Sequence, residues 1–203
     1  MILPRKYVIH ARDWLMSGRK EPDAAFAGDV TLWPNGIVYY SFASDITSLH
    51  QKAFLDAATD WSTFANVIFV RRTTQPNYLF VQNDAGNSSG VGMLGGPQDF
   101  LINAWTRATL CHELGHALGL VHEHQRSDRD SFVTILTQNI QPGFEFAFAL
   151  LPDSNNINAY DFLSTMHYAR NAFSIAILIS TRSSHCQLTS NSSTSWVTIM
   201  GAS

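Results

Sequence analysis

The distribution of apolar residues predicts a strand and a long helix in the first third of the chain. A turn at residues 34–36, Pro-Asn-Gly, precedes an apolar run at residues 37–42 that has the composition of a strand. After this run, up to about residue 64, apolar residues recur at the spacing of an amphipathic helix, at Leu49, Phe54, Ala57, Ala58, Trp61 and Phe64. Ser44 or Asp45 is the predicted N-cap of this helix.

Two β-rich runs and a second helix are predicted next. The runs at residues 67–71 and 78–82 have strand composition, and the glycine-rich stretch after them is predicted to hold a short edge strand near residues 90–93. The second helix is placed at about residues 107–119. Strands, helix, strands and helix in this order indicate an α+β fold. The last 24 residues, 180–203, are half Ser and Thr, which predicts a loose tail.

Composition narrows the classes of function. Charged residues are 14% of the 203-residue chain, and the formal net charge is −3. This balance argues against a nucleic-acid or polybasic membrane surface, and no apolar run reaches the roughly 18 residues that a membrane helix needs. The few apolar residues before Arg5 and Lys6 do not form a secretory signal peptide. Cys111 and Cys186 leave two states open, one disulfide or two reduced thiols.

Histidine and glutamate are concentrated at residues 109–130, which read TLCHELGHALGLVHEHQRSDRD. Successive helix residues turn by about 100°, so His112 and His116 lie about 40° apart, one turn from each other. Both imidazoles can therefore meet on one cation. A leucine-rich stripe on the opposite side is predicted to be buried, at Leu110, Leu114, Ala117 and Val121. Glu113 projects beside the histidines, where it is placed to contact a water on the metal and not to ligate the metal.

A third ligand requires the helix to stop and the chain to reverse. Glycine at the C′ position with positive φ allows this reversal, so Gly119 lets His122 return to the same ion. Three neutral imidazoles with an open fourth position are typical of catalytic zinc, which polarises a carbonyl and lowers the pKa of its water. Glu113 would take the proton of that water and pass it to the leaving amine. His124 is expected to point elsewhere, at the surface or behind the ligands.

This motif and a second one further along the chain carry a family resemblance. Residues 112–135, and the segment YDFLSTMHY at residues 160–168, resemble the zinc-binding and Met-turn motifs of the astacin family of zinc endopeptidases, among the metzincins. The similarity extends over about residues 29–173. It implies a twisted, mostly parallel sheet with two helices in an upper lobe, an irregular lower lobe, and an active-site cleft between them.

The resemblance also sets the expected domain bounds. The catalytic domain is expected at residues 29–179, with the upper lobe at about 29–121 and the lower lobe at about 122–179. Residues 1–28 would be a leader or the remnant of a pro-segment, and residues 180–203 an atypical tail. Relatives are secreted. We expect a monomer that acts on protein or peptide substrates, with no nucleic-acid or membrane partner.

The resemblance assigns roles that spacing alone does not. Met166 would form an apolar floor beneath one zinc ion per chain. Tyr168 would be a fifth ligand at rest and would later donate a hydrogen bond to the oxyanion. Glu123 would contact the mature N-terminus and have a structural role. The extended substrate would be held by β-augmentation on an edge strand, at Gly90, Val91 and Gly92.

Three departures from the family pattern bear on function. Two disulfides are usual in the family, but the upstream positions expected to hold their cysteines are Asn66, Asn87 and Ala104, as in a disulfide-free branch. Asp29, in the segment FAGD, resembles a pro-segment aspartate that ligates zinc in the latent enzyme; the alternative is that it opens the first strand. The sequence after residue 174 does not match the family's final segments. A truncated, catalytically impaired zinc-binding protein is therefore an alternative function, and a module that only binds peptides is another.

Overall fold

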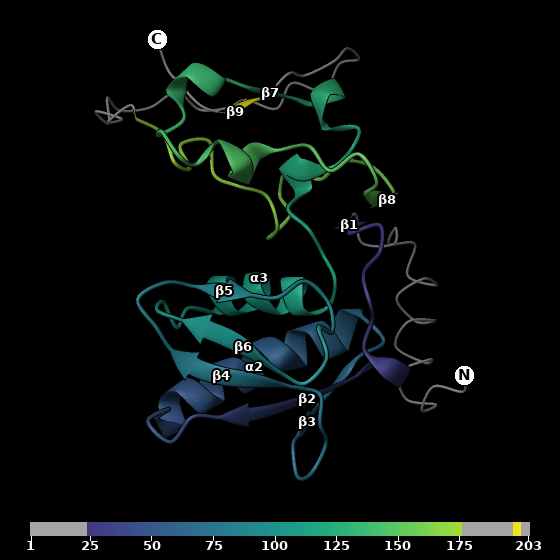
Figure 1. The fold of residues 1–203 in the computed structure, drawn as a ribbon, viewed down its shortest axis with the longest axis vertical. Coiled ribbons are helices and arrows are strands. Elements are labelled where there is room, and N and C mark those ends of the chain that lie inside the picture. The colour runs from purple at the N-terminus through teal and green to yellow at the C-terminus, as the bar shows by residue number, and fades with distance from the viewer. Residues whose placement is uncertain (1–23, 176–196, 200–203) are drawn as a thin grey trace.

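The computed structural model describes residues 24–175 and 197–199, which form two lobes (Figure 1). One lobe holds a five-stranded sheet and two α-helices; it corresponds to the expected upper lobe and is called the sheet lobe. The other consists of short turns and loops after residue 122; it corresponds to the expected lower lobe and is called the irregular lobe. The predicted α+β class with two lobes is therefore confirmed.

Five strands form the sheet: β2 (Ile37–Phe42), β3 (Ile68–Arg71), β4 (Tyr78–Asn83), β5 (Ser88–Ser89) and β6 (Pro97–Ile102). Their order is β3-β2-β4-β6-β5. Neighbours run parallel except β5, which pairs antiparallel with β6 at one edge, so the mostly parallel sheet is confirmed. The apolar pattern does not predict β6, because the buried Gln98 interrupts its alternation of apolar residues.

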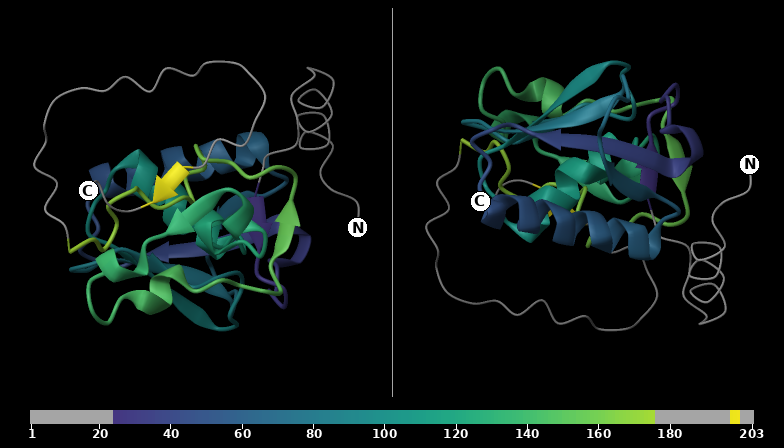
Figure 2. Two further views of the ribbon diagram at one scale, coloured as in Figure 1. Left: turned by 90° about the horizontal axis from the view of Figure 1, so that it is seen from above. Right: turned by 90° about the horizontal axis from the view of Figure 1, so that it is seen from below.

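Two helices cover one face of this sheet, α2 (Ser48–Phe64) and α3 (Arg107–Ala117), as the views along the vertical axis show (Figure 2). The Phe54 ring of α2 is fully buried, and its centroid lies 5.0 Å from that of Tyr40 and 5.6 Å from that of Phe100. The stripe predicted on α3 is buried in the same core, at Leu110, Leu114 and Ala117. Among the described residues, no helix is both long and apolar enough to cross a membrane.

The start of α2 differs from the prediction. Its N-cap is Thr47, whose hydroxyl accepts a hydrogen bond of 3.2 Å from the backbone N–H of His50. Asp45 instead accepts a hydrogen bond of 2.9 Å from the side chain of Asn83 in β4. The prediction of Ser44 or Asp45 as the cap is therefore wrong, since the carboxylate of Asp45 binds the sheet and the helix begins after Thr47.

The irregular lobe is built from short elements around its own core. They are η2 (Glu123–Gln125), η3 (Arg129–Ser131), β7 (Val133–Ile135), η4 (Thr137–Asn139), η5 (Glu145–Phe148), β8 (Asn155–Ile157) and β9 (Val197–Ile199). The buried apolar residues of this lobe are Val133, Ile140, Ala147, Phe148 and Tyr160. β9 pairs in parallel with β7, so three residues of the predicted loose tail form a strand. The rest of residues 180–203 lie outside the described residues.

The N-terminal strand β1 (Ala24–Phe26) contacts both lobes. It pairs antiparallel with β8 in the irregular lobe. On its other side, the carbonyl oxygen of Ala25 accepts a hydrogen bond of 3.0 Å from the N–H of Val121, just after α3. The fold therefore includes residues 24–28, which precede the domain start that the sequence led us to expect.

Candidate metal centre

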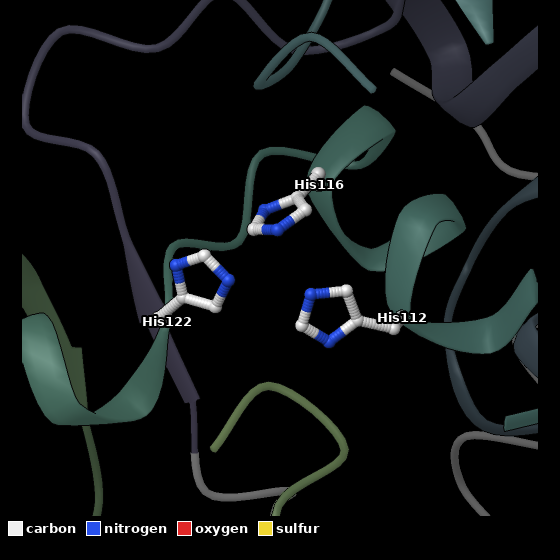
Figure 3. A group of neighbouring side chains, drawn as sticks. All are labelled: His112, His116 and His122. Carbon is white, nitrogen blue, oxygen red and sulfur yellow. The ribbon is translucent and has the colours of Figure 1, made fainter. Parts of the chain in front are cut away.

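Three histidines converge at the end of α3 (Figure 3). One ligand atom of each of His112, His116 and His122 lies within 4.8 Å of the other two. Their ring centroids are 4.7, 5.1 and 4.6 Å apart, and the imidazoles point toward a common centre. The structure thus brings together the three residues that the sequence pattern proposes as ligands.

The chain reversal after α3 depends on Gly119, as the sequence predicts. Its φ is +106°, a left-handed value that disfavours any residue with a Cβ. Its N–H donates a hydrogen bond of 2.8 Å to the carbonyl of His116. A Cβ at this position would also lie 3.0 Å from the side chain of Leu32. This turn directs the chain back toward the helix and places His122 beside the first two histidines.

Each of the three imidazoles has a hydrogen-bond acceptor at its Nδ1 atom. His112 Nδ1 lies 2.7 Å from the carbonyl of Thr165 in the irregular lobe. His116 Nδ1 lies 2.9 Å from the carbonyl of Leu120, and His122 Nδ1 lies 3.0 Å from the side-chain Oε1 of Gln125 in η2. An acceptor at Nδ1 fixes the proton there, so the Nε2 lone pair of each ring is free for a metal ion.

Burial keeps two of the histidines neutral. Burial, together with the neighbouring imidazoles, lowers the pKa of His116 to about 4 and that of His122 to about 2. At neutral pH these rings are therefore electron-pair donors and not cations. A set of three converging imidazole nitrogens suits zinc, which favours nitrogen ligands in this geometry.

Glu113 lies in α3 between the first two histidines. Its side chain is buried, and the burial raises the pKa of the carboxyl to about 7. It does not belong to the cluster of converging ligand atoms. A carboxyl group with this pKa can both accept and release a proton near neutral pH, which is the requirement for general acid–base chemistry.

Met166 lies against the face of α3 between the two helical histidines. It is fully buried, and its sulfur would be 2.6 Å from a Cβ added at Gly115. The carbonyl of Met166 also accepts a hydrogen bond of 3.0 Å from the N–H of Glu123. The spacing of the motif does not single out Gly115, although a glycine inside a helix signals a close approach of this kind.

Tyr168 and His124 stack on the side of the cluster that faces the irregular lobe. The Tyr168 ring centroid lies 4.3 Å from that of His122 and 4.1 Å from that of His124, and burial raises the pKa of the phenol. His124 is fully buried, with Nε2 at 3.0 Å from the carbonyl of Ala147. Of the two positions expected for His124, the surface position is wrong, because the irregular lobe packs over this ring.

Glu123 belongs to a buried ionic network. Its Oε1 accepts hydrogen bonds of 2.8 Å from Arg126 and 2.9 Å from the N–H of Asp161. Asp128 binds the same guanidinium, at 2.9 Å, and Arg126 is 1% exposed. The other carboxylate oxygen of Glu123, Oε2, is buried and has no hydrogen-bond partner among the described residues.

A cavity of about 260 Å³ opens beside the histidines. It lies between the two lobes and is lined by Ser89, Val91, His116, Val121, His122, Gln125, Phe146, Ala147 and Tyr168. The predicted edge strand near residues 90–93 lies two residues earlier, because β5 covers Ser88–Ser89. The N–H of Gly92 donates a hydrogen bond of 2.8 Å to the carbonyl of His116, so the glycine-rich stretch contacts α3 and leaves the sheet.

Asp29 is not brought to the histidines. It lies in an exposed turn and lines a separate cavity of about 500 Å³ together with Asp153. Its carboxylate is absent from the cluster of ligand atoms. It does not open the first strand of the sheet either, since β2 begins at Ile37. The strand alternative for Asp29 is therefore wrong, and its role as a latency ligand stays a prediction.

Comparisons with known proteins agree with this geometry. The model of the peptidase family Astacin matches residues 26–193. The chain belongs to the astacin family. The solved structure of high choriolytic enzyme 1, a hatching enzyme zinc-protease from the medaka fish Oryzias latipes, superposes with a TM-score of 0.65 at 34% sequence identity. The superposition covers 72% of this chain and 76% of the medaka chain.

Curated relatives in the astacin family are longer proteins. Human tolloid-like protein 1 is 38% identical over 177 residues, which are 81% of this chain and 17% of the human protein. The astacin-like metalloendopeptidase of Coturnix japonica is 35% identical over 150 residues, 70% of this chain and 37% of that protein. The chain therefore spans less than two fifths of the length of either of these relatives.

Proposed function

We propose that this chain is a zinc-dependent endopeptidase that hydrolyses internal peptide bonds of proteins. The observation that carries the proposal is the convergence of three imidazoles, each with Nδ1 bound to an acceptor, beside a buried carboxyl group. The Nε2 atoms of His112, His116 and His122 would hold one zinc ion per chain. Bound there, zinc would supply Lewis acidity to the scissile carbonyl and to the attacking water. Membership of the astacin family supports this activity.

Glu113 is the general base of the proposed reaction. Since burial raises its pKa to about 7, the carboxylate can take a proton from the attacking water near neutral pH. The protonated carboxyl then has the proton that the leaving amine needs when the C–N bond breaks. Glu113 lies on α3 between two ligand residues, and it interacts electrostatically with Tyr168, which lines the cavity beside the histidines.

Tyr168 is proposed to donate a hydrogen bond to the carbonyl oxygen of the scissile peptide bond. Its ring packs on His122 and lines the cleft, and burial raises its pKa, so the phenol keeps its proton at neutral pH. A neutral phenol is a hydrogen-bond donor and can stabilise the negative charge that develops on the carbonyl oxygen. The same oxygen can be a fifth ligand before substrate binds.

Three further residues shape the centre without reacting. Gly119 allows the chain to reverse after α3, and Met166 fills the space beneath the helix. Glu123 has a buried carboxylate oxygen without a hydrogen-bond partner among the described residues, which suits a cationic group such as the ammonium of a new N-terminus. The carboxylate would then complete its interactions only after the residues before β1 are removed.

The substrate is a protein or peptide in an extended conformation. β5 is the edge strand on the side of the sheet next to β6, and Gly90, Val91 and Gly92 continue from it toward α3 and the cleft. An extended peptide can add to such an edge through main-chain hydrogen bonds. As in the sequence analysis, we expect the protein to act as a monomer outside the cell.

Hydrolysis of denatured casein tests the proposal. Glu113→Gln keeps the size of the side chain but removes the base, so zinc content should stay near one ion per chain while hydrolysis falls at least about 100-fold. Glu145→Gln is the matched control, because Glu145 is exposed in the irregular lobe and should leave activity unchanged.

Three outcomes would contradict the proposal. A Glu113→Gln variant with near wild-type hydrolysis would remove Glu113 from the mechanism. A wild-type chain that binds one zinc ion and cleaves neither casein nor gelatin would instead support the alternative function, a zinc-binding protein without a working cleft. Peptide affinity that survives chelation, without cleavage, would support a module that only binds peptides.

A further inference from the structure

We propose that Gln125 is a positioning residue that fixes the tautomer and orientation of His122 for metal binding. The inference rests on the proposed zinc site, although it does not require that the chain cleaves peptides. Gln125 follows the third histidine in η2, and its side-chain Oε1 lies 3.0 Å from Nδ1 of His122.

His122 differs from the other two ligands in how its ring is held. His112 and His116 both face main-chain carbonyls, which no substitution removes. The Nδ1 of His122 faces a side-chain amide, so its orientation depends on the identity of one residue. Of the three ligand contacts, the one to Gln125 is therefore the one that mutation can remove.

The two ends of the amide have opposite effects on His122. When Oε1 faces the ring, Nδ1 carries the proton and Nε2 keeps the lone pair that a metal ion needs. If the amide were reversed, its NH₂ group would donate to an unprotonated Nδ1, and the proton would move to Nε2. A ring in that tautomer cannot bind the metal ion through Nε2. Metal binding and the observed orientation of the Gln125 amide therefore favour each other.

Backbone hydrogen bonds hold Gln125 in place independently of its side chain. Its N–H donates to the carbonyl of His122 at 2.9 Å, and its carbonyl accepts from the N–H of Leu151 at 2.8 Å. These bonds fix η2 beside the ligand, and the side chain lies along the wall of the cleft cavity. Substitutions of the side chain should therefore change the contact with His122 while the backbone stays in place.

The test compares two substitutions of similar length. Gln125→Met removes the acceptor, whereas Gln125→Glu keeps an oxygen that can accept from Nδ1. Zinc affinity, measured by competition with a chromophoric chelator, should fall about 10- to 100-fold in Gln125→Met and stay close to wild type in Gln125→Glu. Gln141→Met is the matched control, since Gln141 is exposed in the same lobe and bonds the carbonyl of Ser174.

A second measurement separates orientation from general destabilisation. The ¹⁵N shifts of His122 in the zinc-free protein should report a proton on Nδ1 in the wild type and in Gln125→Glu, and a mixture of tautomers in Gln125→Met. If Gln125→Met does not fold, Gln125→Ala takes its place in both measurements. Wild-type zinc affinity in the acceptor-free variant would overturn the proposal, and so would an equal loss in the Glu and Met variants. If the zinc affinities and tautomers of the variants are as expected but the wild type cleaves no peptide, only the proposed endopeptidase activity is contradicted.

Discussion

The side-chain Oδ1 of Asn87 accepts a hydrogen bond of 2.9 Å from the backbone N–H of Ala104. The same oxygen accepts a second bond of 2.9 Å from the N–H of Asn103, so one amide joins the start of β5 to the end of β6. Asn87 and Ala104 are two of the positions where the family resemblance leads us to expect cysteines. In this chain, hydrogen bonds connect the two positions that the resemblance assigns to a pair of cysteines in relatives.

The first prediction follows from this contact. The double variant Asn87→Cys/Ala104→Cys should form a disulfide, because the two residues already approach within hydrogen-bonding distance. A bridge that closes a loop of this size stabilises by about 3 kcal/mol. The midpoint of thermal unfolding should therefore rise relative to the same protein with reductant. Two free thiols in the oxidised variant, by mass after alkylation, would contradict the prediction.

The second prediction concerns the turn that follows α3. Gly119→Ala should destabilise the fold by about 1–3 kcal/mol, since φ is +106° and the new Cβ would meet the side chains of Leu32, Phe26 and Val30. Zinc affinity should fall as well, because the same turn places His122. Urea denaturation and chelator competition measure the two effects. Gly86→Ala is the control, because a Cβ there meets nothing within 4 Å.

The third prediction tests the contact between Gly115 and Met166. Gly115→Ala should cost about 1–3 kcal/mol by overpacking, since its Cβ would lie 2.6 Å from the methionine sulfur. Shortening the partner makes room for this methyl group, so Met166→Val should cost less in a Gly115→Ala background than in the wild type. A double-mutant cycle of unfolding free energies gives the coupling. Simple additivity of the two changes would show that the residues do not share this space.

The fourth prediction compares a buried with an exposed ion pair. Glu123→Gln should lower the free energy of unfolding by about 1.5–3 kcal/mol, because Arg126 and Glu123 are each about 1% exposed and the guanidinium would keep only one of its two charged partners, Asp128. Asp130→Asn should change it by less than about 1 kcal/mol, since Asp130 is 75% exposed in its pair with Arg129. Similar losses in the two variants would contradict the role of burial.

The fifth prediction concerns removal of the metal. If the proposed zinc ion binds the folded centre and not the unfolded chain, free zinc at 100 times its dissociation constant should stabilise the fold by about 2.7 kcal/mol. Chelation should therefore lower the unfolding midpoint of the wild type. His116→Ala removes one of the three ligands, and its midpoint should respond little to zinc or chelator. An unchanged wild-type midpoint would argue against zinc at this cluster.

The sequence predicts the parts of the site that are local in the chain. Helical geometry places His112 and His116 on one face, and Gly119 predicts the reversal that brings His122 to them. The contact of His112 with Thr165 joins residues 53 positions apart, so periodicity in α3 carries no information about it. The amide of Gln125 lies within the motif, yet its direction depends on the turn of η2, which spacing alone does not define.

The sequence predicts the fold less completely at one edge of the sheet, where β6 and β5 lie. β2, β3 and β4 have apolar patterns that indicate strands, but β6 carries the buried Gln98, whose amide donates a 3.0 Å hydrogen bond to Gly92 and accepts one from Leu94. The hydrogen-bond partners of this buried side chain are backbone groups of a loop, and the apolar pattern of the sequence does not show that the loop lies beside it. The short β5 likewise has no pattern of its own, because two residues are too few to alternate.

The position of β1 between the lobes has a consequence for the substrates that the protein can accept. β1 bonds β8 on one side and the chain after α3 on the other, so the lobes cannot move apart without breaking a strand pairing. The pairings of β1 therefore oppose widening of the cavity beside the histidines. We infer that polypeptide segments which are already unfolded or looped out can enter it, whereas compact domains must first release such a segment.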